Sequence, residues 1–273
     1  MTPRSSWLHR DASVADAFER RAARAAALAE GANADVLAFA AGLYRAQAKV
    51  AAALAGAALS GSLAEDLPRF RAALDAVLRY AGKSGPPGLR AEVDAVKKPD
   101  ALTGRLLDWW RTSRAGRTDY LARAALRAYG ETLAATGVTA EPITPTAASQ
   151  PVAGACARCG GPPWIAWRRS GSGDEAAQRF LGCSLCGSER ILGRIACAAC
   201  GQTEPTKLPV FHTERHGAVR IEACDACLRY VKSIDLTVDG RAVPEIDDLS
   251  SLSLDLWAAE QGYERLEPSL AGV

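Results

Sequence analysis

The sequence has no cysteine before residue 156, no long hydrophobic run and little excess charge of either sign. Its most apolar stretch, residues 50–59, is about ten residues long, which is too short to cross a bilayer. No apolar segment follows Met1, because Arg4, Arg10 and Asp11 come early, so no signal peptide is expected. These features predict no stable membrane insertion and favour a cytoplasmic protein in a reducing compartment, where disulfides are uncommon.

The charge balance argues against a nucleic-acid partner. The chain holds 33 Lys and Arg against 31 Asp and Glu. Residues 151–240 hold eleven against nine, and residues 241–273 hold two against seven. A nucleic-acid-binding surface is normally a clustered basic face. We therefore expect no nucleic acid, and a nucleic-acid-binding zinc ribbon is the least favoured alternative.

The eight cysteines form four Cys-x-x-Cys pairs that repeat in one register. Adding 41 to each position in the first two pairs gives each position in the last two. Each half reads Cys-x2-Cys-x23-Cys-x2-Cys, and ten residues join the halves. The candidate metal ligands are Cys156, Cys159, Cys183, Cys186, Cys197, Cys200, Cys224 and Cys227.

This spacing is typical of tetrathiolate metal sites. A Cys-x-x-Cys pair on a tight turn points two sulfurs at one centre, and a second such turn completes a tetrahedron. Pairing within each half is the economical arrangement and predicts two ions per chain, one per site, although cross-pairing stays open. Iron and zinc suit four thiolates equally. Disulfides and thioredoxin-like redox pairs are weaker alternatives, because a reducing compartment is expected and a redox motif normally occurs once.

The residues around the cysteine pairs predict short turns and strands of the rubredoxin or zinc-ribbon kind. Glycine follows the pair at Gly160, Gly187 and Gly201, where the turn favours a left-handed backbone. Leu228 stands at the fourth such position, so the fourth turn is expected to be built differently. Strands are predicted over residues 164–168, 179–181, 208–211 and 219–221.

The first half of the chain is rich in Ala, Leu and Arg and predicts a compact helical bundle. Ser62 and Glu65 suggest a capping box, and Pro86 and Pro87 break the helical pattern. Helices are expected over residues 13–30, 33–59, 62–80, 100–112 and 118–136.

One more helix is expected near the C-terminus, over residues 247–261, with a stop at Gly262. Its apolar stripe is predicted to contain Leu249, Leu252, Leu256 and Tyr263.

The sequence therefore predicts an α+β protein, in which an N-terminal all-α bundle precedes two tandem tetracysteine modules and a C-terminal helix. The predicted segments are a helical bundle at 1–140, a proline-containing linker at 141–153, a first ribbon module at 154–193, a second at 194–240, and a helix with its tail at 241–273.

No catalytic set of residues stands out, so an accessory or binding protein is expected rather than an enzyme. The stretch 82–84 imitates the end of a phosphate-binding loop but lacks the glycine required five residues earlier. His212 and His216 are four residues apart, yet four sulfurs already fill each site, so surface hairpin positions are favoured. Trp109 and Trp110 are expected to lie partly in the core of the bundle.

Several runs resemble one family, FdhE, the formate dehydrogenase accessory protein. The runs 179–186 and 220–227, the second followed by Tyr230 and Lys232, resemble its cysteine signature. The tail at 247–263 is similar to that family's last helix, and the helix that contains Phe18 is similar to its first. Arg190 is a departure, because family members often have Trp there.

The resemblance implies a cytoplasmic protein that is required for active respiratory formate dehydrogenase. It implies binding to the catalytic subunit, a molybdenum or tungsten enzyme, before export through the twin-arginine route. It also implies rubredoxin-type centres that hold iron. The alternative is an iron-containing, rubredoxin-like redox or oxygen-sensing protein, since iron in a tetrathiolate site changes charge by one electron and zinc does not.

Overall fold

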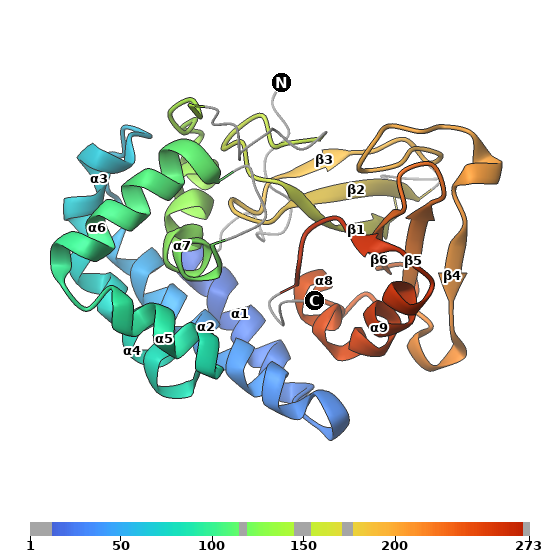
Figure 1. Cartoon of the computed structure of the whole chain (residues 1–273), viewed down its shortest axis with the longest axis horizontal. Helices are drawn as coiled ribbons and strands as arrows, with labels where there is room; N and C mark the ends of the chain where they lie inside the picture. The colour runs from blue at the N-terminus through green and yellow to red at the C-terminus, as the bar shows by residue number, and fades with distance from the viewer. Residues whose placement is uncertain (1–12, 115–118, 145–153, 171–176, 270–273) are drawn as a thin grey trace.

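The computed structural model describes residues 13–114, 119–144, 154–170 and 177–269. Two parts lie side by side, a helical part from the first half of the chain and a twisted sheet with short C-terminal helices (Figure 1). This is the predicted α+β order. No described helix is long and apolar enough to cross a membrane. Most of the linker predicted at 141–153 lies outside the described residues.

The helical part is built around two long helices, α2 (Ala34–Ala53) and α7 (Tyr120–Thr136). Helix α7 is buried on all sides from Leu121 to Leu133, and its alanines let neighbouring helices approach closely. The remaining helices of this part are α1 (Val14–Ala27), α3 (Leu63–Phe70), α4 (Leu74–Ser84), α5 (Pro87–Ala95) and α6 (Pro99–Asp108).

Three local predictions in the helical part are wrong or incomplete. A turn of 3-10 helix (Arg71–Ala73) divides the helix predicted over 62–80. Helix α5 was not predicted, although Pro87 suits its first position because the missing N–H has no intrahelical partner there. The capping box fails, since the Ser62 side chain makes no cap hydrogen bond. The Asp66 carboxylate instead accepts the two backbone N–H groups that precede Ser62, at 3.0 Å.

The second part is a seven-stranded sheet in the order β3-β2-β1-β6-β5-β4, with β7 beside β6. Each half of the cysteine repeat supplies three antiparallel strands. The four predicted strands are present as β1, β2, β4 and β5. The bounds are β1 Pro163–Arg169, β2 Gln178–Cys183, β3 Glu189–Ile191, β4 Val210–His212, β5 Val219–Cys224, β6 Arg229–Asp235 and β7 Glu264–Arg265.

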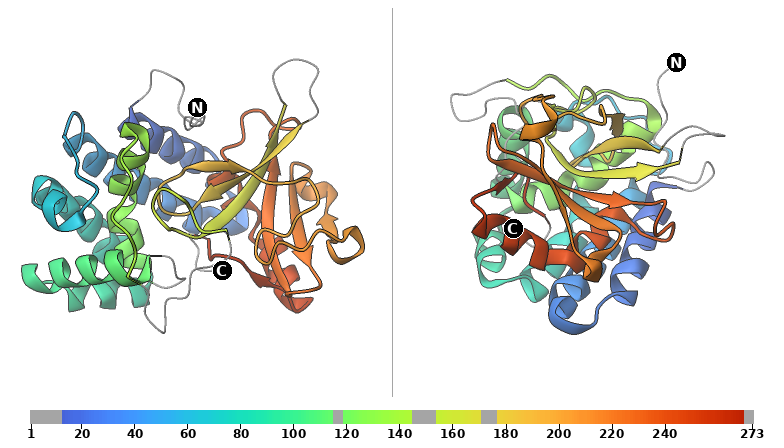
Figure 2. Two further views of the ribbon diagram at one scale, coloured as in Figure 1. Left: turned by 90° about the horizontal axis from the view of Figure 1, so that it is seen from above. Right: turned by 90° about the vertical axis from the view of Figure 1, so that its right-hand side faces the viewer.

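The two halves of the repeat meet in the middle of the sheet (Figure 2). Strands β1 and β6 pair in parallel, with Ile165 opposite Lys232 and Arg168 opposite Asp235. The sheet is therefore continuous from one half to the other. The module boundary at residues 193 and 194 stays a prediction.

The C-terminal helix packs differently from the prediction. In place of one helix over 247–261, the chain forms α8 (Pro244–Asp247), a 3-10 turn and α9 (Leu252–Glu260). The turn changes which side of the helix is buried, so Leu256 of the predicted stripe is 60% exposed while Leu254 is buried. The helix does end at Gly262, whose φ of 84° is left-handed.

A buried ionic cluster joins the helical part to α8. Glu245 lies 2.9 Å from Arg21 Nε and 2.6 Å from Arg127 Nη2. Glu131 of α7 pairs with the same two arginines at 2.8 and 2.9 Å. Burial alone raises the pKa of Glu245, but the two arginines outweigh it and hold that pKa below its usual range. The helices and the C-terminal segment are thus held together by charges shielded from water.

Candidate metal centres

The eight cysteine sulfurs lie in two groups of four, one from each half of the repeat. Within each group, all four sulfurs lie within 4.8 Å of one another. None of the eight cysteines forms a disulfide. The first group, called the first centre, is Cys156, Cys159, Cys183 and Cys186, and the second centre is Cys197, Cys200, Cys224 and Cys227.

Each centre has the dimensions of a tetrahedral metal site. A metal–sulfur distance of about 2.3 Å places the sulfurs of a tetrahedron about 3.8 Å apart. Two sulfur pairs of the first centre are separated by 3.5 and 3.6 Å, and two of the second centre by 3.8 Å. The geometry and the all-sulfur donor set fit zinc or iron. That these cysteines bind the ion stays a prediction.

Crowding of the thiols also favours a bound cation. Hydrogen bonding with the Cys156 sulfur raises the pKa of the Cys159 and Cys183 thiols above the ordinary value, and burial raises it further. Four negative charges this close are unfavourable without a compensating positive charge. A metal ion supplies that charge, and its binding releases the thiol protons.

The same tight turn carries all four cysteine pairs. The residue after each pair donates its N–H to the carbonyl of the pair's first cysteine, at 2.7 to 3.2 Å. Gly160, Gly187 and Gly201 have left-handed φ values between 65° and 76°, as predicted. Leu228 has a φ of 55°, so the prediction of a different fourth turn is wrong. A leucine adopts the conformation that glycine has elsewhere, at a cost of about 1–2 kcal/mol.

Backbone N–H groups of these turns also point at the sulfurs. Gly161 N lies 3.3 Å from Cys159 Sγ, and Ala199 N lies 3.3 Å from Cys197 Sγ. Hydrogen bonds of this kind stabilise a thiolate by spreading its charge onto the backbone. The turns therefore both aim the sulfurs and stabilise their ionised form.

The two centres differ in exposure. Three cysteines of the first centre are buried and Cys156 is half-buried. In the second centre only Cys224 is buried, and Cys200 is exposed. The first centre lies close beneath α7, where a Cβ added to Gly130 would come within 3.0 Å of the Leu185 carbonyl oxygen. Solvent therefore reaches the second centre much more readily than the first.

Arg114, which no sequence motif marks, fixes the first centre to the helical part. Its buried guanidinium donates from Nε to the Cys159 carbonyl at 2.6 Å, and also to the carbonyls of Trp110 and Glu141. The same group stacks 4.7 Å from the centroid of the Trp110 ring. Burial lowers the pKa of Arg114. Trp109 and Trp110 are both buried, so both belong to the core of the bundle.

A second buried ionic group, called the Lys232 cluster, lies between β6 and the C-terminal segment. Its members are Lys232, Asp248, Asp255 and Arg265. Lys232 Nζ lies 3.0 Å from Asp248 and 2.6 Å from Asp255. Arg265 pairs with the same two carboxylates at 2.8 and 2.9 Å. Tyr230, three residues after the last cysteine, donates to Asp255 at 2.8 Å. The cluster thus holds β6 against α9.

The other sequence candidates lie away from the sulfurs. His212 is exposed on β4, and His216 Nε2 lies 3.1 Å from Ser253 Oγ. Neither histidine belongs to a cysteine group. The stretch 82–84 forms the end of α4 and not a loop after a strand, so it has no phosphate-binding context.

Comparison with known proteins supports one family throughout. Residues 195–271 match the family model "FdhE, C-terminal domain". The crystal structure of the FdhE protein from Pseudomonas aeruginosa matches with a TM-score of 0.65 and 26% identity, over 96% of this chain and 97% of that one. The chain is similar to FdhE proteins over nearly its whole length. An FdhE homologue from Rhizobium meliloti is 28% identical over 95% of this chain and 92% of its own length.

Other FdhE homologues have a higher sequence identity to this chain, but over a shorter stretch of it. The homologue from Aquifex aeolicus is 38% identical over 117 residues, and that from Pseudomonas aeruginosa is 38% identical over 121. These matches span only 41% and 38% of the relatives' lengths.

The residues that resemble FdhE have structural roles in this chain. Phe18 is fully buried, and the Gln47 side chain donates to the Ala124 carbonyl at 2.8 Å, which joins α2 to α7. Tyr230 and Lys232 both contact the carboxylates of the Lys232 cluster. The FdhE-like runs therefore hold the turns, the sheet and the C-terminal segment in one arrangement.

Proposed function

We propose that this protein is a member of the FdhE family, a cytoplasmic accessory protein required to form active respiratory formate dehydrogenase. It binds the catalytic subunit of that enzyme before export and is not itself an enzyme. The proposal is carried by the match to an FdhE structure over nearly the whole of both chains. The absence of disulfides among the eight cysteines supports a reducing compartment.

The two centres support a structural role for the ions, one held by each set of four cysteines. Four thiolates complete the coordination of one ion and leave no open position for water or substrate. In small finger peptides, structural zinc contributes on the order of 10–16 kcal/mol to folding. An ion at each centre makes the turns rigid, and rigid turns on a continuous sheet present a fixed surface to a partner.

A gene deletion tests the proposed role. In cells that lack the gene, the rate of formate-dependent dye reduction should fall at least tenfold, while an immunoblot still detects the catalytic subunit. The wild-type gene on a plasmid should restore activity. Full activity in the deletion strain, at equal catalytic-subunit content, would remove the proposal.

Exposure of Cys200 favours a second candidate, a rubredoxin-like redox or oxygen-sensing protein. Electrons and oxygen reach an exposed centre more easily than a buried one, and iron in such a site changes charge by one electron. Protein purified without oxygen and then oxidised should be red if it holds iron and colourless if it holds zinc. A reversible one-electron titration that changes affinity for the catalytic subunit supports this candidate. Colourless protein with two zinc ions per chain rules it out.

A further inference from the structure

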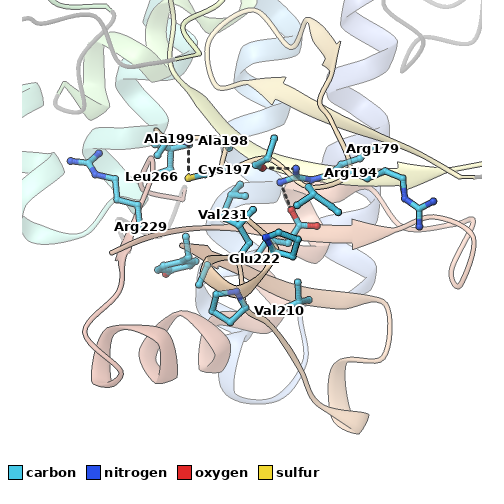
Figure 3. Close-up of a pocket in the computed structure, with 17 residues that line it drawn as sticks. Arg179, Arg194, Cys197, Ala198, Ala199, Val210, Glu222, Arg229, Val231 and Leu266 are labelled. Atoms are coloured by element: carbon cyan, nitrogen blue, oxygen red, sulfur yellow. Dashed lines mark hydrogen bonds and ion pairs between the residues drawn. The ribbon is translucent and has the colours of Figure 1, made fainter. Parts of the chain in front are cut away.

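A cavity of about 190 Å³ lies beside the second centre, between the segment that joins the two halves and one face of the sheet. Figure 3 shows the residues that line it, including Cys197 and Val231. A volume of this size holds roughly six water molecules, or one large apolar side chain. Its lining is mainly small and apolar. It includes Ala196, Ala198 and Leu208, together with residues of β5 and β6.

Two large apolar side chains at this cavity are exposed to solvent. Ile195 and Val210 both line it, and each is 51% exposed. Val210 begins β4, which is the last strand of the sheet in the described order. An edge strand with an adjoining apolar cavity is suited to a partner segment in extended conformation, whose alternate side chains enter a pocket.

Charge differs between the two ends of the cavity. Arg229 and Arg194 lie at opposite ends (Figure 3). Arg229 pairs with Glu264 at 3.7 Å and lies on the side of Cys197, where four thiolates that hold a divalent ion would carry a net charge of about −2. The end near Arg229 is therefore not positive overall.

The end near Arg194 is positive. Between the two ends, the Glu222 carboxylate is already paired with Arg179, which also donates to the carbonyls of Gly193 and Ala196. Arg194 itself is exposed. It makes no hydrogen bond or ion pair with the residues that the structure describes. Its guanidinium is thus available to an incoming carboxylate.

We propose that this cavity binds one apolar side chain of an extended segment of the partner, and that an acidic residue of the same segment pairs with Arg194. This inference rests on the proposed function, because it takes the catalytic subunit of formate dehydrogenase as the partner. It adds the surface that binds the partner and the chemistry of the segment that is bound.

Binding of overlapping peptides tests the inference. Fifteen-residue peptides that cover the catalytic subunit are screened against the metal-loaded full chain, and fluorescence anisotropy gives the dissociation constant of each peptide that binds. The variants Ile195→Glu and Arg194→Glu alter the cavity. The controls are Val238→Glu, at a side chain 64% exposed elsewhere, and Arg241→Glu, whose side chain is 89% exposed. Metal content is measured for every variant.

The peptide that binds best should contain a large apolar residue and a nearby acidic one. Ile195→Glu and Arg194→Glu should each weaken its binding at least tenfold with the metal retained, whereas both controls should stay within twofold of the wild type. Replacing the acidic residue of the peptide by Lys should restore binding to Arg194→Glu, because the two charges are exchanged.

Three results of the peptide screen overturn the inference. No peptide binds, or the bound peptides lack the apolar and acidic residues, or the cavity variants bind as tightly as the controls. If the intact catalytic subunit still binds wild type and cavity variants equally, the cavity proposal fails and the accessory role stands. If formate oxidation does not depend on the gene, the accessory role fails, whatever the peptides show.

Discussion

Replacing Lys232 by Met tests how much the Lys232 cluster stabilises the second half of the sheet. Lys232 is fully buried, and its Nζ contacts two carboxylates and also the carbonyls of Asp248 and Ser251, at 2.7 and 3.2 Å. Methionine keeps most of the volume but removes the charge. Asp248 and Asp255 are then left in the core with Arg265 as their one remaining cation within the Lys232 cluster.

The expected loss of unfolding free energy is large. Removing one partner of a buried ion pair typically costs 3–5 kcal/mol, because the opposite charge stays buried and uncompensated. For a chain of this size, each kcal/mol lowers the melting temperature by about 2–4 °C. The melting temperature of Lys232→Met should therefore fall by roughly 10 °C. The matched control is Lys97→Met, since Lys97 is 73% exposed and pairs with Asp94 at 3.0 Å; its effect should be under about 0.5 kcal/mol.

Urea unfolding followed by circular dichroism, with both variants saturated with metal, measures the difference. The loss should also depend on pH. Burial opposes ionisation of Asp248, but Arg265 and Lys232 outweigh it and hold the pKa of Asp248 below its usual range. Stability from this carboxylate is complete above its unfolded pKa of about 3.9 and is lost as the pH falls through the lower folded value. A Lys232→Met protein within about 1 kcal/mol of the wild type at pH 7 would refute the reasoning.

Three further predictions concern the metal centres. Leu228→Gly should raise the free energy of unfolding by up to about 1 kcal/mol, because it relieves a left-handed leucine that is 56% exposed; the reverse change Gly201→Leu should lower it by a similar amount. A chelator should remove one ion per chain at least about tenfold faster than the other, because Cys200 is exposed and most of the first centre is buried. Elemental analysis should give about two ions per chain, and about one in Cys183→Ser.

Each of these measurements has an opposite outcome that counts against the structure. Leu228→Gly less stable than the wild type would show that the leucine is not strained. Loss of both ions in one kinetic phase would contradict the difference in exposure. Cys200→Ser should remove only the fast phase and Cys183→Ser only the slow one, so the two variants identify which centre is which. Equal metal content in Cys183→Ser and wild type would contradict the proposed ligands.

The local features around the cysteine pairs could be predicted from the sequence, whereas the division of the helix at 71–73 and the existence of α5 were not. The cysteine pairs, the glycines after them and the alternation of nearby apolar residues are encoded within a few positions, and the structure has these turns and strands. The fourth turn was mispredicted because the sequence shows the preference for glycine but not the hydrogen bond that holds Leu228 in place, from its N–H to the Cys224 carbonyl at 2.8 Å.

The features that could not be predicted depend on residues far apart in the chain. Glu245 meets Arg21 and Arg127 only after the helical part and the C-terminal segment pack together. Arg114 binds carbonyl groups, which every residue has, so no side-chain pattern identifies its partners. The exposure of Leu256 follows from one 3-10 turn that rotates the helix, and a helical periodicity read through that turn gives the wrong face.

The parallel pairing of β1 with β6 means that neither half of the cysteine repeat is an independent finger. A fragment that ended at residue 193 would leave the N–H and C=O groups of 165–168 open along a bare strand, and such edges recruit other strands. Either half produced alone should self-associate even when loaded with metal. A gene split between the halves should instead yield two polypeptides that recombine, because each one covers the edge the other leaves bare.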